Sequence, residues 1–106
     1  EEEVMSGYSP ERPIDFTVVI TNGASGTTTV GGDKTIMRYA LISPAVGGTI
    51  EFLDSDSWSL EAADITQLRE VFHCDNFRIG ANGSMTTVRI EGANGTYRGR
   101  MWPKYL

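Results

Sequence analysis

Hydrophobic and polar residues alternate with a period of two over much of the chain, and this pattern predicts β-strands rather than helices. The segments that alternate, or that have strand-type composition, are residues 14–21, 27–30, 34–43, 49–53 and 76–102. Residues 34–43, KTIMRYALIS, form the most apolar run and predict a central strand covered on both faces. Residues 27–30, TTTV, are almost wholly polar and predict a strand at a sheet edge or on a solvent-facing surface.

Residues 76–102 contain a near repeat, RIGANGSM followed by RIEGANGT. Each copy places Asn-Gly between residues of strand type, and Asn-Gly is the strongest short-range signal for a hairpin turn. The repeat therefore predicts a meander of three consecutive antiparallel strands, joined by turns at Asn82-Gly83 and Asn94-Gly95.

Two-residue turns fix the register of this meander, and the register assigns every side chain to a face. Glu91 then lies opposite Arg98, and Arg89 lies opposite Arg100. The core face collects Phe77, Ile79, Val88, Ile90, Tyr97 and Met101. The other face collects Arg78, Thr87, Arg89, Glu91, Arg98, Arg100 and Trp102. Over the whole chain, the predicted core is Phe16, Val18, Ile20, Tyr39, Leu41, Ile50, Phe52, Leu68, Phe72, Phe77, Ile79, Val88 and Ile90.

One short helix is predicted at about residues 65–73, after the polar loop DSDSWS. Asp64 caps this helix, Gln67 completes a capping box, and the apolar residues from Ile65 to Phe72 lie on one helical face. The fold class is therefore mainly β. We expect an antiparallel β-sandwich or partly open barrel of about seven strands, with the short helix over one end.

The length of 106 residues fits a single domain with its own core. Residues 1–13, EEEVMSGYSPERP, are charged and carry two prolines, which predicts a flexible leader or linker. Residues 14–106 then form the single β-rich domain. The start EEEV, without an initiator methionine, favours a domain processed or excised from a longer chain.

The net charge of −5 hides an asymmetry between the two parts of the chain. Residues 1–75 hold four basic and thirteen acidic residues, a net charge of −9, whereas residues 76–106 hold five basic and one acidic, a net charge of +4. An acidic chain repels phosphate backbones, so we expect no nucleic-acid partner, although one face can still hold a local anionic group. No run approaches the roughly 20 apolar residues of a membrane span.

Catalytic and metal-binding motifs are absent from the sequence. The loop that starts at Asp54 fails the EF-hand pattern, because Trp58, Ser59 and Ile65 occupy its fifth, sixth and twelfth positions. Cys74 is the single cysteine, and its helical neighbour His73 would point about 100° away from it. We therefore predict a non-enzymatic chain with no catalytic residue, no metal and no cofactor. Asn82 and Asn94 match the N-glycosylation pattern, but hairpin chemistry already explains both.

The candidate binding residues are those of the polar meander face: Arg78, Arg89, Arg98, Arg100 and Trp102. A solvated face with an ordinary Glu91–Arg98 pair explains part of this pattern. The directly opposed Arg89 and Arg100 are unfavourable unless something negative relieves them, which favours a contact surface.

The expected function is a non-catalytic interaction or assembly module of a larger surface, secreted or particle-associated protein. Its partner is then protein, through self-association or through other domains of a larger chain, in an extracellular or particle-associated setting. The alternative is a carbohydrate-binding module that uses exposed aromatics, with Trp58, Trp102 and Tyr8 as stacking platforms. A third possibility is a fragment that supplies one wall of an enzyme site.

Overall fold

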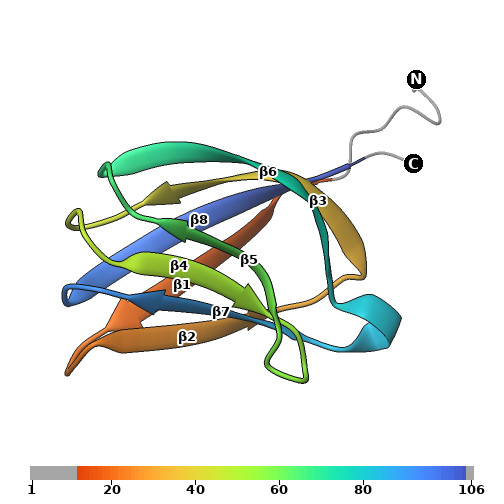
Figure 1. Cartoon of the computed structure of the whole chain (residues 1–106), viewed down its shortest axis with the longest axis horizontal. Coiled ribbons are helices and arrows are strands. Elements are labelled where there is room, and N and C mark those ends of the chain that lie inside the picture. Colours follow the sequence, from red (N-terminus) through yellow and green to blue (C-terminus); the bar gives the residue numbers. More distant parts are fainter. Residues whose placement is uncertain (1–11, 105–106) are drawn as a thin grey trace.

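Two four-stranded antiparallel sheets stack face to face in the computed structural model, which describes residues 12–104 (Figure 1). Sheet A has the strand order β1-β8-β3-β6, and sheet B has the order β2-β7-β4-β5. The strands are β1 (Ile14–Ile20), β2 (Ser25–Val30), β3 (Lys34–Ile42), β4 (Thr49–Leu53), β5 (Ser59–Asp64), β6 (Arg69–Ile79), β7 (Thr86–Glu91) and β8 (Gly95–Pro103). A short 3₁₀ turn, η1 (Ala81–Gly83), precedes β7. The predicted mainly β sandwich is confirmed, with eight strands in place of about seven.

The core lies between the sheets and is built from alternate residues of each strand. All the predicted core residues are buried except Leu68, which is 54% exposed, and Phe72, which is half-buried. Aromatic rings hold the centre of the core: Tyr39 packs edge-to-face on Phe52 at 4.9 Å between ring centroids, and Phe16 packs edge-to-face on Phe52 at 6.0 Å. Such contacts contribute beyond the buried area alone.

The sheet positions predicted for two strands are confirmed, but the prediction that the first of them is covered on both faces is wrong. Strand β3 lies inside sheet A, between β8 and β6, while its residues Met37 and Ile42 are 44% and 46% exposed. Strand β2, the TTTV run, lies at the edge of sheet B beside β7. Composition predicts both places because an interior strand buries side chains against two neighbours, whereas an edge strand tolerates polar ones.

The predicted helix at about residues 65–73 is wrong, since residues 69–79 form the 11-residue strand β6. Side chains along this strand alternate between exposed and half-buried, which is a period of two, and Phe72 stacks on Tyr39 at 4.7 Å between ring centroids. The helical spacing of Ile65, Leu68 and Phe72 is a coincidence of three residues. Pairing with β3 and the ring contact outweigh it, because local helix propensity is a weak preference that tertiary contacts override.

The predicted meander is also wrong, because β6, β7 and β8 do not pair with one another. Strand β6 pairs with β3, β7 pairs with β2 and β4, and β8 pairs with β1 and β3. The chain crosses from sheet A to sheet B through η1, and it returns to sheet A at Asn94-Gly95. Asn82 and Gly83 do have the positive φ expected of Asn-Gly, at 56° and 80°. Their turn leads the chain across the core instead of folding it back into the same sheet.

The inward and outward positions predicted for these strands nevertheless hold. Phe77, Ile79, Val88, Ile90, Tyr97 and Met101 are all buried. Alternation along one strand decides which side chains face inward, whichever neighbour that strand pairs with. The error therefore lies in the partners of each strand and not in its faces.

The predicted leader, residues 1–13, lies almost entirely outside the described residues, and β1 begins at Ile14. Among residues 12–104, no helix has the length and apolar character needed to cross a membrane.

Candidate functional site

The outer face of sheet A carries a concentration of arginines, which we call the arginine face. Its five members come from three adjacent strands: Arg38 on β3, Arg69 and Arg78 on β6, and Arg98 and Arg100 on β8. Their strand neighbours Tyr39, Ile79 and Tyr97 are buried, so the arginines point away from the core. Asp15 on β1 lies on the same face, with its Cα paired to that of Arg100.

The structure brings together four of the five predicted binding residues. Arg78, Arg98, Arg100 and Trp102 lie on this outer face, whereas Arg89 lies on the outer face of sheet B. The Arg89 guanidinium is 2.5 Å from the Glu51 carboxylate and 3.8 Å from that of Glu91. The predicted Arg89–Arg100 and Glu91–Arg98 pairs are therefore wrong, because β7 and β8 belong to different sheets.

Sequence reasoning missed Arg38 and Arg69 as members of the arginine face. Arg38 lies within the apolar run of β3, and its Cα is paired with that of Trp102 on β8. Arg69 was hidden by the helix prediction. The period-two pattern of residues 69–79, REVFHCDNFRI, is the signal that places Arg69, Val71 and His73 on one face.

Three of these arginines have partners within the described residues. Arg100 donates two hydrogen bonds to Asp15, at 2.6 and 3.1 Å, and Arg78 donates one to Asp33 at 2.9 Å. The hydrogen bond from Arg100 lowers the pKa of the Asp15 carboxyl below its ordinary value. The Arg38 guanidinium lies 4.2 Å from the centroid of the Trp102 ring, a cation–π contact.

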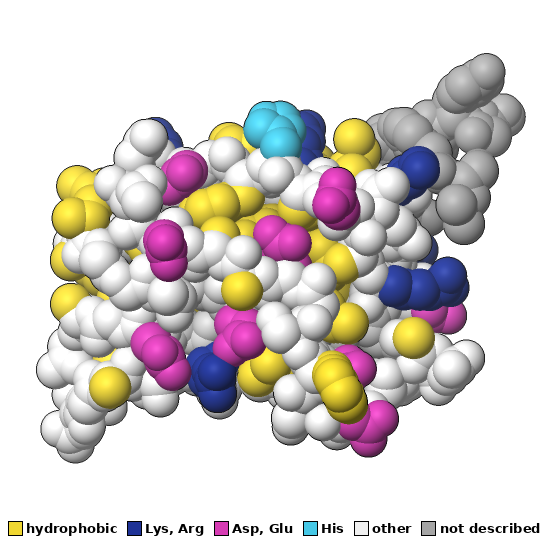
Figure 2. All heavy atoms as spheres, viewed as in Figure 1, with side chains coloured by type: hydrophobic (Ala, Val, Ile, Leu, Met, Phe, Trp, Pro, Cys, Tyr) yellow, Lys and Arg dark blue, Asp and Glu magenta, His cyan; other side chains and the backbone are white. Residues whose placement is uncertain are grey.

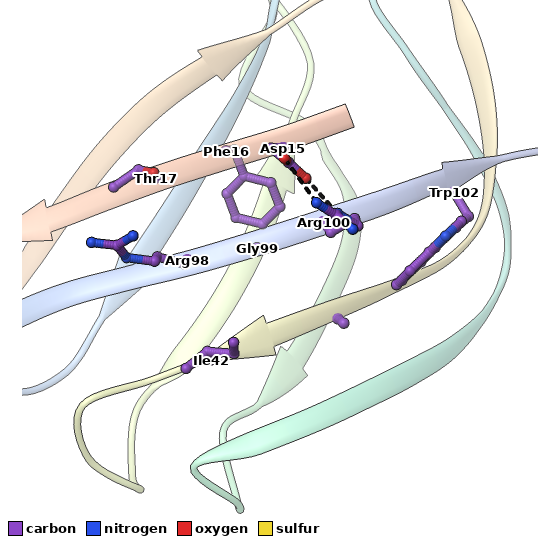
Figure 3. Close-up of a pocket in the computed structure, with 9 residues that line it drawn as sticks. Asp15, Phe16, Thr17, Ile42, Arg98, Gly99, Arg100 and Trp102 are labelled. Atoms are coloured by element: carbon purple, nitrogen blue, oxygen red, sulfur yellow. Dashed lines mark hydrogen bonds and ion pairs between the residues drawn. The ribbon is translucent and has the colours of Figure 1, made fainter. Parts of the chain in front are cut away.

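Arg98 and Arg69 have no ion pair or hydrogen bond within residues 12–104. Arg98 borders a hollow of about 470 Å³ in the outer face of sheet A. The hollow is lined by Asp15, Phe16, Thr17, Ala40, Ile42, Arg98, Gly99, Arg100 and Trp102. Figure 3 shows Arg98 and Trp102 at opposite ends of this stretch of β8, with the Arg100–Asp15 pair between them and Ile42 on neighbouring β3.

A small residue on the outer face creates the hollow. Ala40, the β3 neighbour of Arg100, has a side chain too short to fill the space between the longer side chains around it, whereas Gly99 contributes backbone to the floor and faces the Phe16 ring on its inner side. The result is a shallow depression with guanidinium groups on its walls, an aromatic ring at one end and the aliphatic side chain of Ile42 beside them. Such a surface can hold a carboxylate while it covers an adjacent apolar group.

The remaining candidates from the sequence are dispersed. Trp58 is 73% exposed in the loop between β4 and β5 of sheet B, and Tyr8 lies outside the described residues. His73 and Cys74 are consecutive residues of a strand, so their side chains point to opposite faces. Burial raises the pKa of the Cys74 thiol to about 11. No group of three or more His, Cys, Asp or Glu side chains within residues 12–104 is arranged to hold a metal ion.

No protein-family model, curated protein or solved structure matches this chain.

Proposed function

We propose that this chain is a non-catalytic β-sandwich interaction module, and that its arginine face binds a carboxylate-bearing surface of a protein partner. The observation that carries the proposal is the state of Arg98. Its guanidinium is exposed and unpaired within residues 12–104, and it borders the hollow over Ala40 and Gly99.

The contrast between paired and unpaired arginines supports this proposal. Arg100 already holds a carboxylate in a two-bond fork, which shows the geometry that a guanidinium on this face adopts toward an acid. Arg98 lies two residues away on the same strand and the same face, with no acid of its own among the described residues. A partner carboxylate at the hollow would complete a second pair.

The charge of the whole chain favours a protein partner over nucleic acid. The net charge of −5 sets up a field that repels a polyanion, whereas a local cationic face still attracts single carboxylates. The outer face of sheet B carries Glu51, Asp64 and Glu91 around Arg89, so the cationic character belongs to one side of the sandwich.

The carbohydrate-binding alternative stays a prediction. Trp58 lies in the loop between two strands of sheet B and Trp102 lies on β8 of sheet A, so they do not form one stacking platform, and the guanidinium of Arg38 lies against the Trp102 ring. An assembly role in a surface, secreted or particle-associated protein is likewise part of the proposal.

The test uses a capped heptapeptide of alternating glutamate and threonine as the acidic probe, titrated into isotopically labelled protein by NMR. We expect the amide shifts to concentrate on β8 and β3 around the hollow. Arg98→Ala should weaken binding by about 5- to 10-fold, which corresponds to the loss of one charge-assisted contact of roughly 1–1.4 kcal/mol. Binding should also weaken as salt is added, because the face is solvent-exposed.

Arg89→Ala is the matched control, since it removes the same side chain from the opposite sheet and should leave the affinity unchanged. Both variants should keep the melting temperature nearly constant, as expected for surface substitutions. Equal loss of affinity in the two variants, shifts spread over both sheets, or no binding of the glutamate peptide would each overturn the proposal.

A further inference from the structure

The two sides of the sandwich differ in how closely the sheets approach each other. On the side where β1 lies over β2, a Cβ added at Gly26 would lie 2.5 Å from the Val19 carbonyl oxygen, so the strands are in tight contact. On the side where β5 lies near β6, four apolar residues are only partly buried against the core: Leu60, Ala63, Phe72 and Cys74. We call this side the open edge.

Figure 2 shows hydrophobic side chains uncovered between β6 and β5, with acidic side chains among them. One of the acidic residues of this region, Glu61, occupies an inward-facing position. Its Cα is paired with that of Phe52, as that of Ala63 is with Ile50, and both Phe52 and Ile50 are fully buried. Glu61 therefore faces the gap between the sheets, where strand alternation calls for an apolar side chain.

The Glu61 carboxylate has no cationic partner within residues 12–104. Burial raises its pKa above the ordinary value and the neighbouring Asp75 carboxylate raises it further, while the nearby Tyr39 hydroxyl acts in the opposite direction. A desolvated carboxylate beside a second one is unfavourable in its charged form, and an added cation would relieve both effects.

The hydroxyl of Tyr39 is the second unusual group at the open edge. Tyr39 is fully buried, and its hydroxyl makes no hydrogen bond of good geometry among the described residues, although the Glu61 carboxylate lies near enough to act as its acceptor. Burial, followed by the charge of the nearby Glu61 carboxylate, raises the pKa of Tyr39 well above its ordinary value. By contrast, the other fully buried tyrosine, Tyr97, donates a hydrogen bond to the Ala93 carbonyl at 2.7 Å. A buried hydroxyl without a well-formed hydrogen bond is rare in a folded protein, and the Tyr39 oxygen keeps acceptor capacity for a donor supplied on binding.

The backbone at this edge has no strand beside it among the described residues. Within residues 12–104, β5 and β6 are the last strands of their sheets, so each presents along its outer side a row of N–H and C=O groups that no other strand of this part pairs with. The 11-residue length of β6 gives an added strand room to pair along most of its length. Addition of an extended peptide to such an edge is a common mode of peptide recognition.

We propose that the open edge binds an extended, lysine-bearing segment of another protein, which adds as a strand beside β6 and directs its lysine toward Glu61 and the Tyr39 hydroxyl. A lysine fits this gap because its aliphatic stem packs against apolar walls, here Leu60 and Phe72. Its ammonium group carries three donors, for which the Glu61 carboxylate and the Tyr39 oxygen are acceptors, and the charge of the nearby Asp75 carboxylate favours it further.

A second copy of this chain is a poor source of that lysine. The chain has two lysines, Lys34 and Lys104, and each lies at one end of a strand in sheet A. Lys104 also donates its backbone N–H to the Thr35 carbonyl, which ties it to β3. The segment is therefore expected from a different protein.

The experiment uses three capped heptapeptides of alternating threonine and valine. In the first, lysine replaces the central valine, so it shares a face with the other valines. In the second, norleucine takes the same place, and in the third, lysine replaces a threonine on the opposite face. We expect the first peptide to bind at least about 10-fold more tightly than the other two, and to shift the NMR signals of β6 and β5 amides.

The matched variants are Glu61→Gln and Asp64→Asn, two isosteric changes on β5, one facing inward and one exposed. Glu61→Gln should lower the affinity for the first, lysine-centred peptide about 10-fold and leave the affinity for the norleucine peptide unchanged. Asp64→Asn should change neither affinity. A Glu61→Gln variant that keeps its NMR fold but binds the lysine peptide like the unmodified protein would overturn the proposal. Equal affinities of the three peptides, or no binding of any, would overturn it as well.

A negative result at the open edge is distinguishable from a negative result at the arginine face. Each proposal is tested with its own peptides, its own variants and the NMR signals of its own strands. A dimer in light scattering that Glu61→Gln abolishes would show a second copy at this edge, and would also refute the proposal.

Discussion

Gly99 offers the sharpest stability test of the fold, because the Phe16 ring fills the space that a side chain at residue 99 would need. The two residues are Cα partners across β1 and β8. The three atoms nearest to a Cβ built on Gly99 are Cζ, Cε2 and Cε1 of Phe16, all closer than the 3.0 Å that real Cβ contacts respect. Phe16 is 5% exposed and packs on Phe52, so its ring cannot leave without opening the core.

Gly99→Ala should therefore destabilise the protein by about 1–3 kcal/mol, the usual cost of overpacking a closed core. For a domain of this size, a loss of about 2 kcal/mol lowers the melting temperature by roughly 8–16 °C. Gly31→Ala is the control, since the nearest atom to its added Cβ is the sulfur of Met85, an exposed and flexible side chain. The control should change stability by less than about 0.5 kcal/mol.

The cause is tested by a double-mutant cycle with Phe16→Leu. The clashing atoms form the outer half of the ring, and a leucine side chain ends before it reaches their positions. Gly99→Ala should then cost clearly less in the Phe16→Leu background, with a coupling of about 0.5–3 kcal/mol measured by urea unfolding. Strict additivity of the two changes would refute the contact, and with it the pairing of β1 with β8.

Two further predictions concern the open edge. Because its pKa is raised to about 11 from 9.0, the Cys74 thiol should react with iodoacetamide at pH 8 about 100-fold more slowly in the folded protein than in urea, and rates within a few-fold of each other would contradict this. Tyr39→Phe removes a hydroxyl that makes no well-formed hydrogen bond, so it should leave stability unchanged or raise it by up to about 1 kcal/mol. Tyr97→Phe should cost about 1 kcal/mol by removing the bond to Ala93, and equal losses in thermal unfolding would show that the Tyr39 hydroxyl is fully paired.

The faces of the strands are predictable from the sequence, whereas their partners are not. Val88 and Ile90 alternate with polar residues, and a period of two identifies the buried side in any pairing. Asn82-Gly83 and Asn94-Gly95 predict turns with positive φ, and Asn82, Gly83 and Gly95 have it. Whether such a turn returns to the same sheet or crosses to the other depends on contacts far away in the chain, here those of β7 with β2 and β4.

The candidate site shows the same division. Alternation predicts that Arg78, Arg98, Arg100 and Trp102 face outward, and all four share one face despite the change of partners, since β6 and β8 both lie in sheet A. Arg89 was placed with them only through the predicted β7–β8 pairing, which does not exist. The hollow itself required knowledge of β3, because Ala40 comes from a segment about 60 residues away from Arg100 in sequence.

The inward position of Glu61 was hidden for a different physical reason. Residues 59–64, SLEAAD, have low strand propensity and hold one large apolar residue, so neither composition nor alternation identifies β5. Its pairing with β4 makes it a strand, and this pairing turns the Glu61 carboxylate toward the gap, beside the Tyr39 hydroxyl that has no well-formed hydrogen bond. An apolar residue at position 61 would suit the isolated sandwich better, because burying a charge without a partner opposes folding. The polar groups at the open edge therefore oppose folding of the isolated chain, and we expect the proposed lysine of a partner strand to relieve this cost by pairing with Glu61.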